Sequence, residues 1–585
     1  MLRPSRTIAS LIHALTLGTA ATIGLGAVAT VAIGCKDEGQ PDYWVDKLDD
    51  TAWRPRAVKR LEQFFEDAIT RANKDMQATE VKQLLDVIVE PLTKTYVENY
   101  DQLDTKTRVS LIKLLSAFED KRIAPAIKKA FEEFAKRPKT SADEADIKWA
   151  ARAMKNLKMP ELAGPMLDAF QKMKTHSMLG GIVYRDLNEA MLAMPQQSWA
   201  GPLKQMLEVE IEPLGQKPDP GAVDEYKDQL FWQTTAAQLL GELGDPSAVE
   251  PLLKVMLDPT KADVQGTAVL ALVKIGKPAA DLAIKLLKGD LDKLEQHYVN
   301  RYKKATKSDK SPEGEPYKQV AALVLGTIGH AAAAEPMVKE LEKTQDDSVK
   351  AVIARELTKL PPTAETKAAF KNTFESISAE TIVPPGMNAL QMLAESSTGF
   401  YEPDMVPWMS ERASKAAGYG EDKKALQSAL TVSMLKIGKA DQLNLMKQAV
   451  KDYGTKLESD ILELAEKQLK ACGDRVSCYL AELEKSENQD QKNQFAGIKA
   501  GYMLGVLGNE STRGEIIERF DAMENPALRF VAAQAIDHLA PKGSVAEAAK
   551  LEAIVEKNAR SGDRSKIQGD QPLKEVMYRI RSRAQ

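Results

Sequence analysis

Ala236-Ala-Gln-Leu-Leu-Gly-Glu-Leu-Gly244 aligns without a gap with Ala321-Ala-Leu-Val-Leu-Gly-Thr-Ile-Gly329. The similarity continues at the same offset, because Val249-Glu-Pro-Leu-Leu-Lys254 aligns with Ala334-Glu-Pro-Met-Val-Lys339. A third version of the block, Thr267-Ala-Val-Leu-Ala-Leu-Val-Lys-Ile-Gly-Lys-Pro278, stands between them. The distance along the chain from Ala236 to Ala321 equals about two units of the 40–47 residues that are typical of paired-helix repeats. These stretches therefore predict a repeat array.

A short motif marks the second half of each unit: a small or acidic residue, then proline, then mostly apolar residues. It occurs six times, with its prolines at Pro125, Pro165, Pro202, Pro251, Pro336 and Pro407. Proline suits the first turn of a helix, where its missing amide hydrogen would have no partner anyway. Glycine commonly follows the end of a helix, and glycines end the apolar blocks at Gly244, Gly276, Gly329, Gly438 and Gly508. Each unit is therefore predicted to be one helix stopped by glycine and a second helix opened by proline.

Apolar residues within the units follow helical spacing, as in Val109, Ile112, Leu115 and Phe118. Such a stripe lies on one helix face, so neighbouring helix pairs must stack to bury their apolar surfaces. The chain has 585 residues, more than the roughly 250–300 at which a single core stops growing. Ala, Leu, Lys and Glu are prominent, and these residues favour helix.

This pattern resembles the HEAT family, in its short-linker form related to phycobilisome-lyase-type repeats. The resemblance implies an all-α fold, an α-solenoid of about a dozen HEAT-like helix pairs over residues 43–560. Residues 561–585 are expected to hold a C-terminal capping helix and tail. The segments 212–224 and 303–316 are predicted loops, and Val383-Pro-Pro-Gly386 is a hinge candidate.

The N-terminus has the pattern of an export signal. Arg3 and Arg6 precede a stretch from Thr7 to Gly34 that contains no Lys, Arg, Asp or Glu. A positive start, an apolar run and small residues before a cleavage site are typical of secretory signals. The alternative is an uncleaved membrane helix, because the run is longer than the ~18 residues that suggest a span. Both interpretations place the chain after residue 35 outside the cytoplasm.

The sequence around Cys35 resembles the lipobox of bacterial lipoproteins, although Ala32 stands where that family prefers leucine. The resemblance implies a signal peptide over 1–34, a lipid on Cys35 and a short tether over 35–42. Lys36 rather than aspartate after the cysteine favours the outer membrane, by analogy with the sorting rule of that family. We therefore expect an exported protein that is lipid-anchored to a bacterial envelope membrane, facing the periplasm or the cell surface.

The two other cysteines are Cys472 and Cys478. Two close cysteines in an exported protein indicate one local disulfide. The alternatives are two free thiols or a metal site, and the second is weakened because no histidine or further cysteine pair lies nearby in the sequence.

Catalytic and cofactor motifs are not found. The sequence has no G-x-x-x-x-G-K-[ST] phosphate loop, no H-E-x-x-H and no G-x-S-x-G elbow. The histidines after the signal are scattered, at His176, His297, His330 and His538. Net charge is −4 with the signs interspersed, which does not favour nucleic acid as a partner. We expect no enzyme activity, no cofactor and no metal.

Two clusters are weak candidates for partner binding. Tyr298, Arg301, Tyr302 and Lys304 interleave aromatic and basic residues and would suit an anionic partner or lipid headgroups. The alternative is a helix whose long cations cover apolar neighbours. Methionines and aromatics gather over 387–409, where flexible Met side chains would suit a promiscuous surface. Core packing at helical spacing is the alternative there.

The function that these observations favour is a membrane-anchored scaffold or adaptor for proteins in the cell envelope, since a solenoid offers a long surface to its partners. The partners themselves are not identified by the sequence. Two alternatives remain: a structural envelope component that associates with itself, and an enzyme like the lyases of the related repeats, from which no residues carry over.

Overall fold

The computed structural model describes residues 37–136, 141–175, 180–416, 423–488, 494–561 and 563–584. The predicted signal peptide, Cys35 and His176 lie outside these ranges. The chain forms two compact units that divide between Leu92 and Thr93.

The first unit contains α1 (Pro41–Asp46), α2 (Arg54–Arg71) and the beginning of α3 (Thr79–Glu98). The indole of Trp44 is buried, and its Nε1 donates a hydrogen bond to the carbonyl oxygen of Glu38 at 2.7 Å. The buried Arg54 side chain donates to the carbonyl oxygen of Leu48 at 2.7 Å. The first contact joins α1 to the residues before it, and the second joins the start of α2 to the turn after α1.

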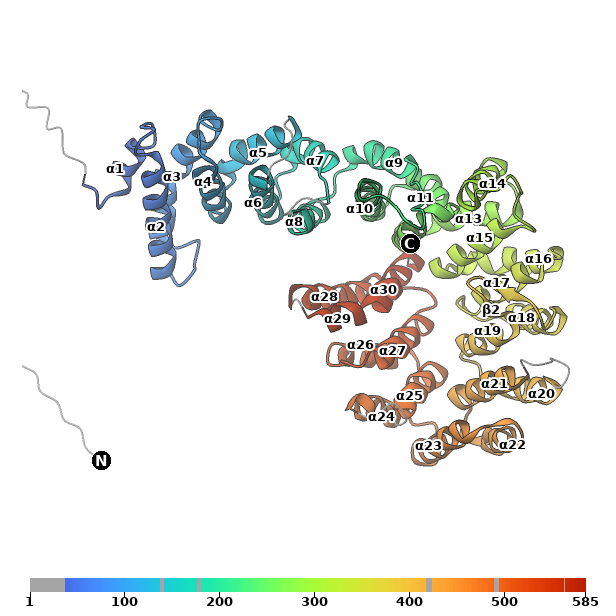
Figure 1. The fold of residues 1–585 in the computed structure, drawn as a ribbon. Helices are drawn as coiled ribbons and strands as arrows, with labels where there is room; N and C mark the ends of the chain where they lie inside the picture. The colour runs from blue at the N-terminus through green and yellow to red at the C-terminus, as the bar shows by residue number, and fades with distance from the viewer. Residues whose placement is uncertain are drawn as a thin grey trace, which may run out of the picture. The chain divides into compact units, whose positions relative to one another are not determined.

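The second unit is an all-α solenoid of twelve helix pairs within its described residues, as the sequence predicted (Figure 1). The first helices of the pairs are α4 (Thr105–Ala117), α6 (Ser141–Leu157), α8 (Gly180–Ala193), α10 (Pro220–Leu243), α12 (Ala262–Ile275), α15 (Pro316–Ile328), α17 (Asp347–Leu357), α19 (Ala389–Ser396), α21 (Lys423–Ile437), α23 (Lys456–Cys472), α25 (Gln494–Leu507) and α27 (Pro526–His538). The second helices are α5 (Ala124–Lys136), α7 (Ala163–Lys172), α9 (Ala200–Glu208), α11 (Val249–Met256), α13 (Lys277–Lys288), α16 (Ala334–Lys343), α18 (Ala364–Ser376), α20 (Met405–Lys415), α22 (Leu443–Tyr453), α24 (Val476–Lys485), α26 (Glu510–Phe520) and α28 (Val545–Ser561).

Consecutive pairs stack so that the first helices form one layer and the second helices another. First helices pack on the first helices that follow them, as α4 on α6 and α6 on α8, and second helices pack between them, as α11 against α12. Polar contacts hold the first layer in register. The guanidinium of Arg108 on α4 pairs with Asp146 on α6 at 2.7 Å, and Arg152 on α6 pairs with Asp186 on α8 at 2.8 Å.

The six motif prolines each lie in the first turn of a second helix, which confirms their predicted role. Many of these helices are preceded by one 3-10 turn; these turns are η1 (Lys121–Ile123), η2 (Pro160–Leu162), η3 (Gln197–Trp199), η4 (Pro246–Ala248), η6 (Ala331–Ala333) and η10 (Ala440–Gln442). Proline pre-sets the backbone angle φ that both kinds of helix require.

The glycines after the first helices act in two ways. Gly244 and Gly329 are left-handed, with φ of 61° and 69°, as predicted for a helix stop. Gly438 and Gly508 are not among the residues with positive φ. A side chain at Gly438 would instead approach the carbonyl oxygen of Met434 to 2.8 Å. At these two positions glycine is needed for close packing rather than for backbone freedom.

Several elements depart from the predicted loops. Helix α10 already begins at Pro220, and α14 (Asp292–Thr306) extends into the segment 303–316. The hinge candidate at 383–386 is the turn of a small antiparallel hairpin, formed by β1 (Ile382–Val383) and β2 (Met387–Asn388). Its Pro384-Pro385 peptide bond is cis. The segment is therefore the turn of a hairpin with paired strands on both sides rather than an open loop.

The C-terminal helices fold back onto the middle of the second unit. After α29 (Arg564–Gly569), α30 (Gln571–Arg583) packs on α27 and α28 and also on α12 and α15. Leu573, Met577 and Ile580 are buried on α30. In Figure 1 the red C-terminal helices accordingly run beside the yellow and green ones. The first helices from α12 to α27, closed by α30, thereby form a circuit within the second unit.

Among the helices of the described ranges, none is both long enough and apolar enough to cross a membrane.

Candidate functional site

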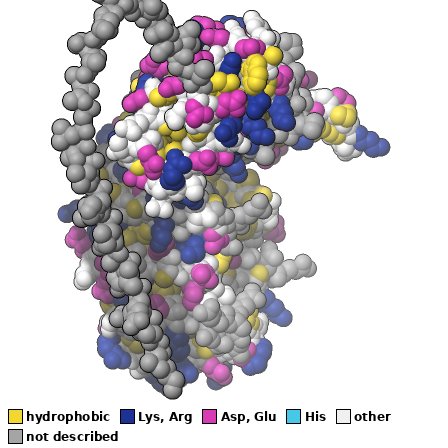
Figure 2. All heavy atoms as spheres, turned by 90° about the vertical axis from the view of Figure 1, so that its left-hand side faces the viewer, with side chains coloured by type: hydrophobic (Ala, Val, Ile, Leu, Met, Phe, Trp, Pro, Cys, Tyr) yellow, Lys and Arg dark blue, Asp and Glu magenta, His cyan; other side chains and the backbone are white. Residues whose placement is uncertain are grey.

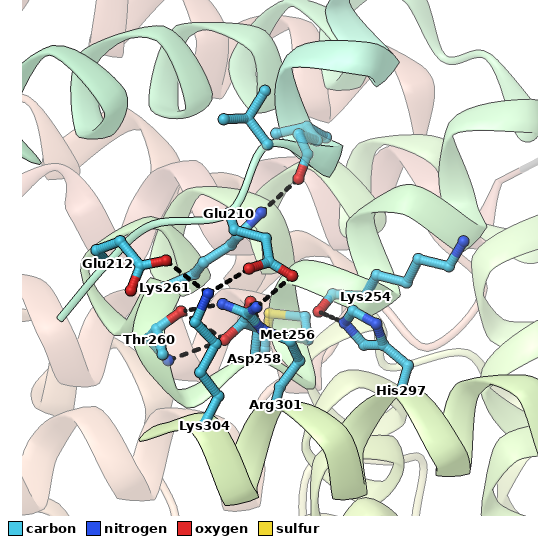
Figure 3. Close-up of polar contacts among 12 residues, drawn as sticks. Glu210, Glu212, Lys254, Met256, Asp258, Thr260, Lys261, His297, Arg301 and Lys304 are labelled. Carbon is cyan, nitrogen blue, oxygen red and sulfur yellow. Dashed lines mark hydrogen bonds and ion pairs between the residues drawn. The ribbon is translucent and has the colours of Figure 1, made fainter. Parts of the chain in front are cut away.

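The basic group on α14 that the sequence singled out is held inside the fold (Figure 3). Arg301 is buried, and its Nε lies 2.7 Å from Asp258 while its Nη1 lies 2.8 Å from Glu210. Its Nη2 donates to Thr260 Oγ1 at 2.8 Å. All three guanidinium nitrogens are therefore engaged with the chain itself.

Lys304 lies one turn further along α14 and pairs with Glu210 and Glu212. Hydrogen bonds from Lys304 and Arg301 lower the pKa of the Glu210 carboxyl. Tyr298 and Tyr302 are half-buried, with their ring centres 6.2 Å apart. The two cations are thus neutralised by neighbouring carboxylates, and the geometry favours the structural alternative for this cluster over anion binding.

Two further residues complete this internal network. Lys261 is buried and donates through Nζ to the carbonyl oxygen of Leu207, and burial lowers its pKa to about 8. His297 Nε2 lies 3.2 Å from the carbonyl oxygen of Lys254, and burial lowers the pKa of its imidazole. Together these contacts attach the inserted helix α14 to α11 and to the segment after α9.

The methionine cluster is mostly core. Met392, Met405 and Met409 are buried, and Trp408 packs edge-on against Phe374 with ring centres 5.0 Å apart. Met387, on the small hairpin, is exposed. The packing alternative is therefore the better description of this region.

A cavity that the sequence did not predict lies inside the closed circuit. Its volume is about 250 Å³. The residues around it come from α17, α19, α25, α27 and α30 and from the segments beside them, among them Arg355, Tyr401, Tyr502, Phe530, His538 and Arg583. Phe530 is 47% exposed and faces this space. No local sequence signal marks these residues as a group, because only the return of the C-terminal helices brings them together.

The wall of this cavity is occupied by contacts within the chain. Burial raises the pKa of Asp537, but Arg583 and Arg579 on α30 outweigh it and hold that pKa below its usual value. Arg583 also donates from Nε to the carbonyl oxygen of Gly329 at 2.9 Å. The ring of His538 stacks on Tyr401 at 4.4 Å, and burial lowers the pKa of that imidazole to about 4. The C-terminal helices thus contact the end of α15 at Gly329 and the segment after α19 at Tyr401 from inside the circuit.

The structure joins Cys472 to Cys478 by a disulfide whose Cα atoms are 5.3 Å apart. Cys472 ends α23 and Cys478 lies in the first turn of α24, so the bond spans the turn between the two helices. No group of three potential metal ligands occurs among the described residues.

The described surface carries both signs of charge. In the face that Figure 2 shows, Lys and Arg side chains alternate with Asp and Glu and with small apolar patches. Any charged interaction site must therefore be a local feature.

Comparison with known proteins identifies the class of fold. Residues 233–297, from within α10 to within α14, match the family of HEAT repeats. A crystal structure of Kap121p is similar to the chain at 12% identity and a TM-score of 0.20, covering 90% of this chain and 74% of that one. A Kap121p triple mutant gives the same identity and TM-score, with 92% and 75% covered. No match was found among curated proteins. Residues 233–297 thus resemble HEAT repeats, and the helices of the structure themselves show the all-α solenoid.

Proposed function

We propose that this chain is a protein-interaction scaffold, held at a membrane of the bacterial cell envelope by a lipid on Cys35. HEAT-type solenoids are in general interaction scaffolds, because stacked pairs present extended surfaces that partners can follow. The observation that carries the proposal is the continuous layer of first helices from α4 to α10, whose contacts keep consecutive pairs in register.

The membrane anchor rests on the sequence before residue 36 and is tested separately. Metabolic labelling with a fatty acid, followed by fractionation, should show lipid on the wild type and on a Cys472→Ser control. The Cys35→Ser variant should lose the label and leave the membrane fraction. Equal labelling of both variants would contradict lipidation at Cys35.

Export has an independent readout in the other two cysteines. Disulfides persist outside the cytoplasm, whereas cytosolic thiols are kept reduced. Protein taken from cells with free thiols blocked at lysis should yield a Cys472–Cys478 bridged peptide. Complete blocking of both thiols would argue against export.

The scaffold itself is tested by crosslinking the tagged, full-length protein in cells and identifying what is captured by mass spectrometry. One dominant partner protein is expected. Crosslinks only between copies of this chain would instead support a structural, self-associating component of the envelope.

A further inference from the structure

A strip of basic side chains crosses the exposed face of the first three helices in the second unit. We call it the basic strip, and it contains Lys106 and Lys113 on α4, Lys148, Arg152 and Lys155 on α6, and Arg185 on α8. All six side chains are exposed or half-exposed. Within α4 and α6 they are spaced by three, four or seven residues, which places them on one face of each helix. Direct contacts between α4, α6 and α8 make the strip continuous.

Carboxylates balance part of this charge, on the α6 and α8 side of the strip. Among the described side chains of the three helices, Glu144 and Asp146 are buried beneath the strip, and Asp146 pairs with Arg108. Asp186 is buried and pairs with Arg152, and Glu189 pairs with Lys155 at 2.7 Å and with Arg185 at 3.9 Å, so these three cations of the strip have carboxylate partners. The chain as a whole has 84 acidic and 80 basic residues. An excess of cations on three adjacent helices is thus a local departure from the composition of the chain.

An aromatic side chain stands in the middle of the strip. Trp149 is half-buried, with Lys148 Nζ 5.2 Å and Arg152 Cζ 4.8 Å from its ring centre. Contact with the indole restricts both cations, so less conformational entropy is lost when they bind a ligand. Between α6 and α8 a hollow of about 340 Å³ is lined by Arg152, Lys155 and Glu189, among others.

The geometry points to an acidic, extended segment of a partner protein as the occupant of the basic strip. This inference rests on the proposed scaffold function and names the class of partner. Neighbouring helix axes lie about 8–10 Å apart, so three helices span about 20 Å. That distance fits roughly six residues of extended chain at ~3.3 Å each. Lys106 and Lys148 make no ion pair within the described part of the chain and are available to carboxylates.

A segment of protein suits the strip better than a duplex or a bilayer. The strip spans about 20 Å on three helices, which is short for the continuous row of phosphates that a duplex or a bilayer presents. The hollow beside Lys155 offers room for a side chain, which a peptide carries and a phosphate backbone does not.

The test uses full-length protein in detergent and a fluorescein-labelled octaglutamate peptide, with binding followed by fluorescence anisotropy. The double variant Lys106→Glu, Lys148→Glu should bind about tenfold more weakly, since two attractive charges become repulsive. The matched control Lys288→Glu, Lys293→Glu reverses two exposed cations on α13 and α14 and should bind within about twofold of the wild type. Trp149→Ala, a variant without a change of charge, should weaken binding about threefold.

Several outcomes would overturn the inference. These are no binding of octaglutamate by the wild type, or equal losses in the double variant and its control. If the wild type binds anionic vesicles or duplex DNA more tightly than octaglutamate, and the double variant loses that binding, the occupant of the strip is a membrane or a nucleic acid and not a peptide. If the double variant fails to fold by circular dichroism, unchanged binding by Trp149→Ala still contradicts the proposal.

In-cell crosslinking separates this inference from the scaffold function. A partner captured equally by the wild type and the double variant would support the scaffold function and would rule out the basic strip as its binding surface. No partner with either protein would reject the scaffold, even if octaglutamate binds.

Discussion

The buried Lys499 joins α25, one of the returning C-terminal helices, to the end of α21. Its side chain is fully buried on α25, and its Nζ donates at 2.9 Å to the carbonyl oxygens of Leu435 and Gly438. These carbonyls lie at the end of α21, where a helix leaves acceptors without intrahelical partners. Burial lowers the pKa of this lysine to about 7. The sequence gives no sign of this role, because an isolated lysine between apolar residues is usually a surface residue.

The depressed pKa of Lys499 makes stability depend on pH in a defined direction. Between pH 7 and the unfolded value near 10.4, the unfolded chain binds one proton more than the folded chain. The free energy of unfolding contributed by this residue should therefore rise with pH across that window, by roughly 5 kcal/mol at most. Urea denaturation of the wild type and of Lys499→Met at several pH values checks this. The free energy of unfolding of the wild type, relative to that of Lys499→Met, should rise with pH. A difference that stays constant with pH would contradict the assignment.

Gly505 marks another close approach at the residue scale. A methyl group there would collide with the ring of Tyr401, which α25 meets inside the closed circuit. Gly505→Ala should lower the free energy of unfolding by about 1–3 kcal/mol, as overpacking does. Gly514→Ala is the control, since that helical glycine has open space around it and alanine favours helix by up to ~1 kcal/mol. Chemical denaturation distinguishes them, and a stabilised Gly505→Ala would show that the contact is absent.

At the scale of elements, the sequence predicts the helix pairs well and the inserted helix poorly. Pro251 and Gly244 fix helix starts and ends through local backbone chemistry, so their effect can be deduced from a few residues. The role of Arg301 depends on Glu210, which is ninety-one positions away and belongs to the segment after α9. Helical spacing predicts which face of α14 is polar. It does not predict that this face meets a carboxylate from another helix pair. The basic cluster therefore looks like a binding site until its partners are seen.

Arg301 should matter far more for stability than Lys304. Arg301→Ala leaves Asp258 buried without its cation, which typically costs about 3–5 kcal/mol. Lys304→Ala removes only partly exposed ion pairs and should cost less than about 1 kcal/mol. Urea denaturation of both variants measures the difference. Equal losses would mean that α14 is not anchored through Arg301.

At the scale of the second unit, the decisive feature is the return of α30 to α12 and α15. The sequence predicts the helix and its apolar face, with Leu573, Met577 and Ile580. It does not predict what that face covers, because any exposed end of an apolar array would satisfy the same pattern. The sequence does not predict the cavity around Tyr401 and His538 for the same reason.

Removing α30 tests this closure. A chain ending at Asp570 should lose amide protection in α12 and α15, since the apolar side chains that cover them are gone. Hydrogen exchange with mass spectrometry reads each helix separately, and α5 and α7, which are remote in the array, serve as internal controls. Unchanged exchange in α12 and α15 would mean that the contact with α30 contributes nothing in solution.

The central claim is that partners meet the open first layer near α6 and not the closed circuit. Site-specific photo-crosslinking in cells tests it most directly, with a photo-activatable phenylalanine analogue placed at Trp149 or at Phe530. The account predicts that one partner protein is crosslinked from position 149, through a peptide rich in Asp and Glu, and not from position 530. Capture of that partner from position 530 alone would contradict it.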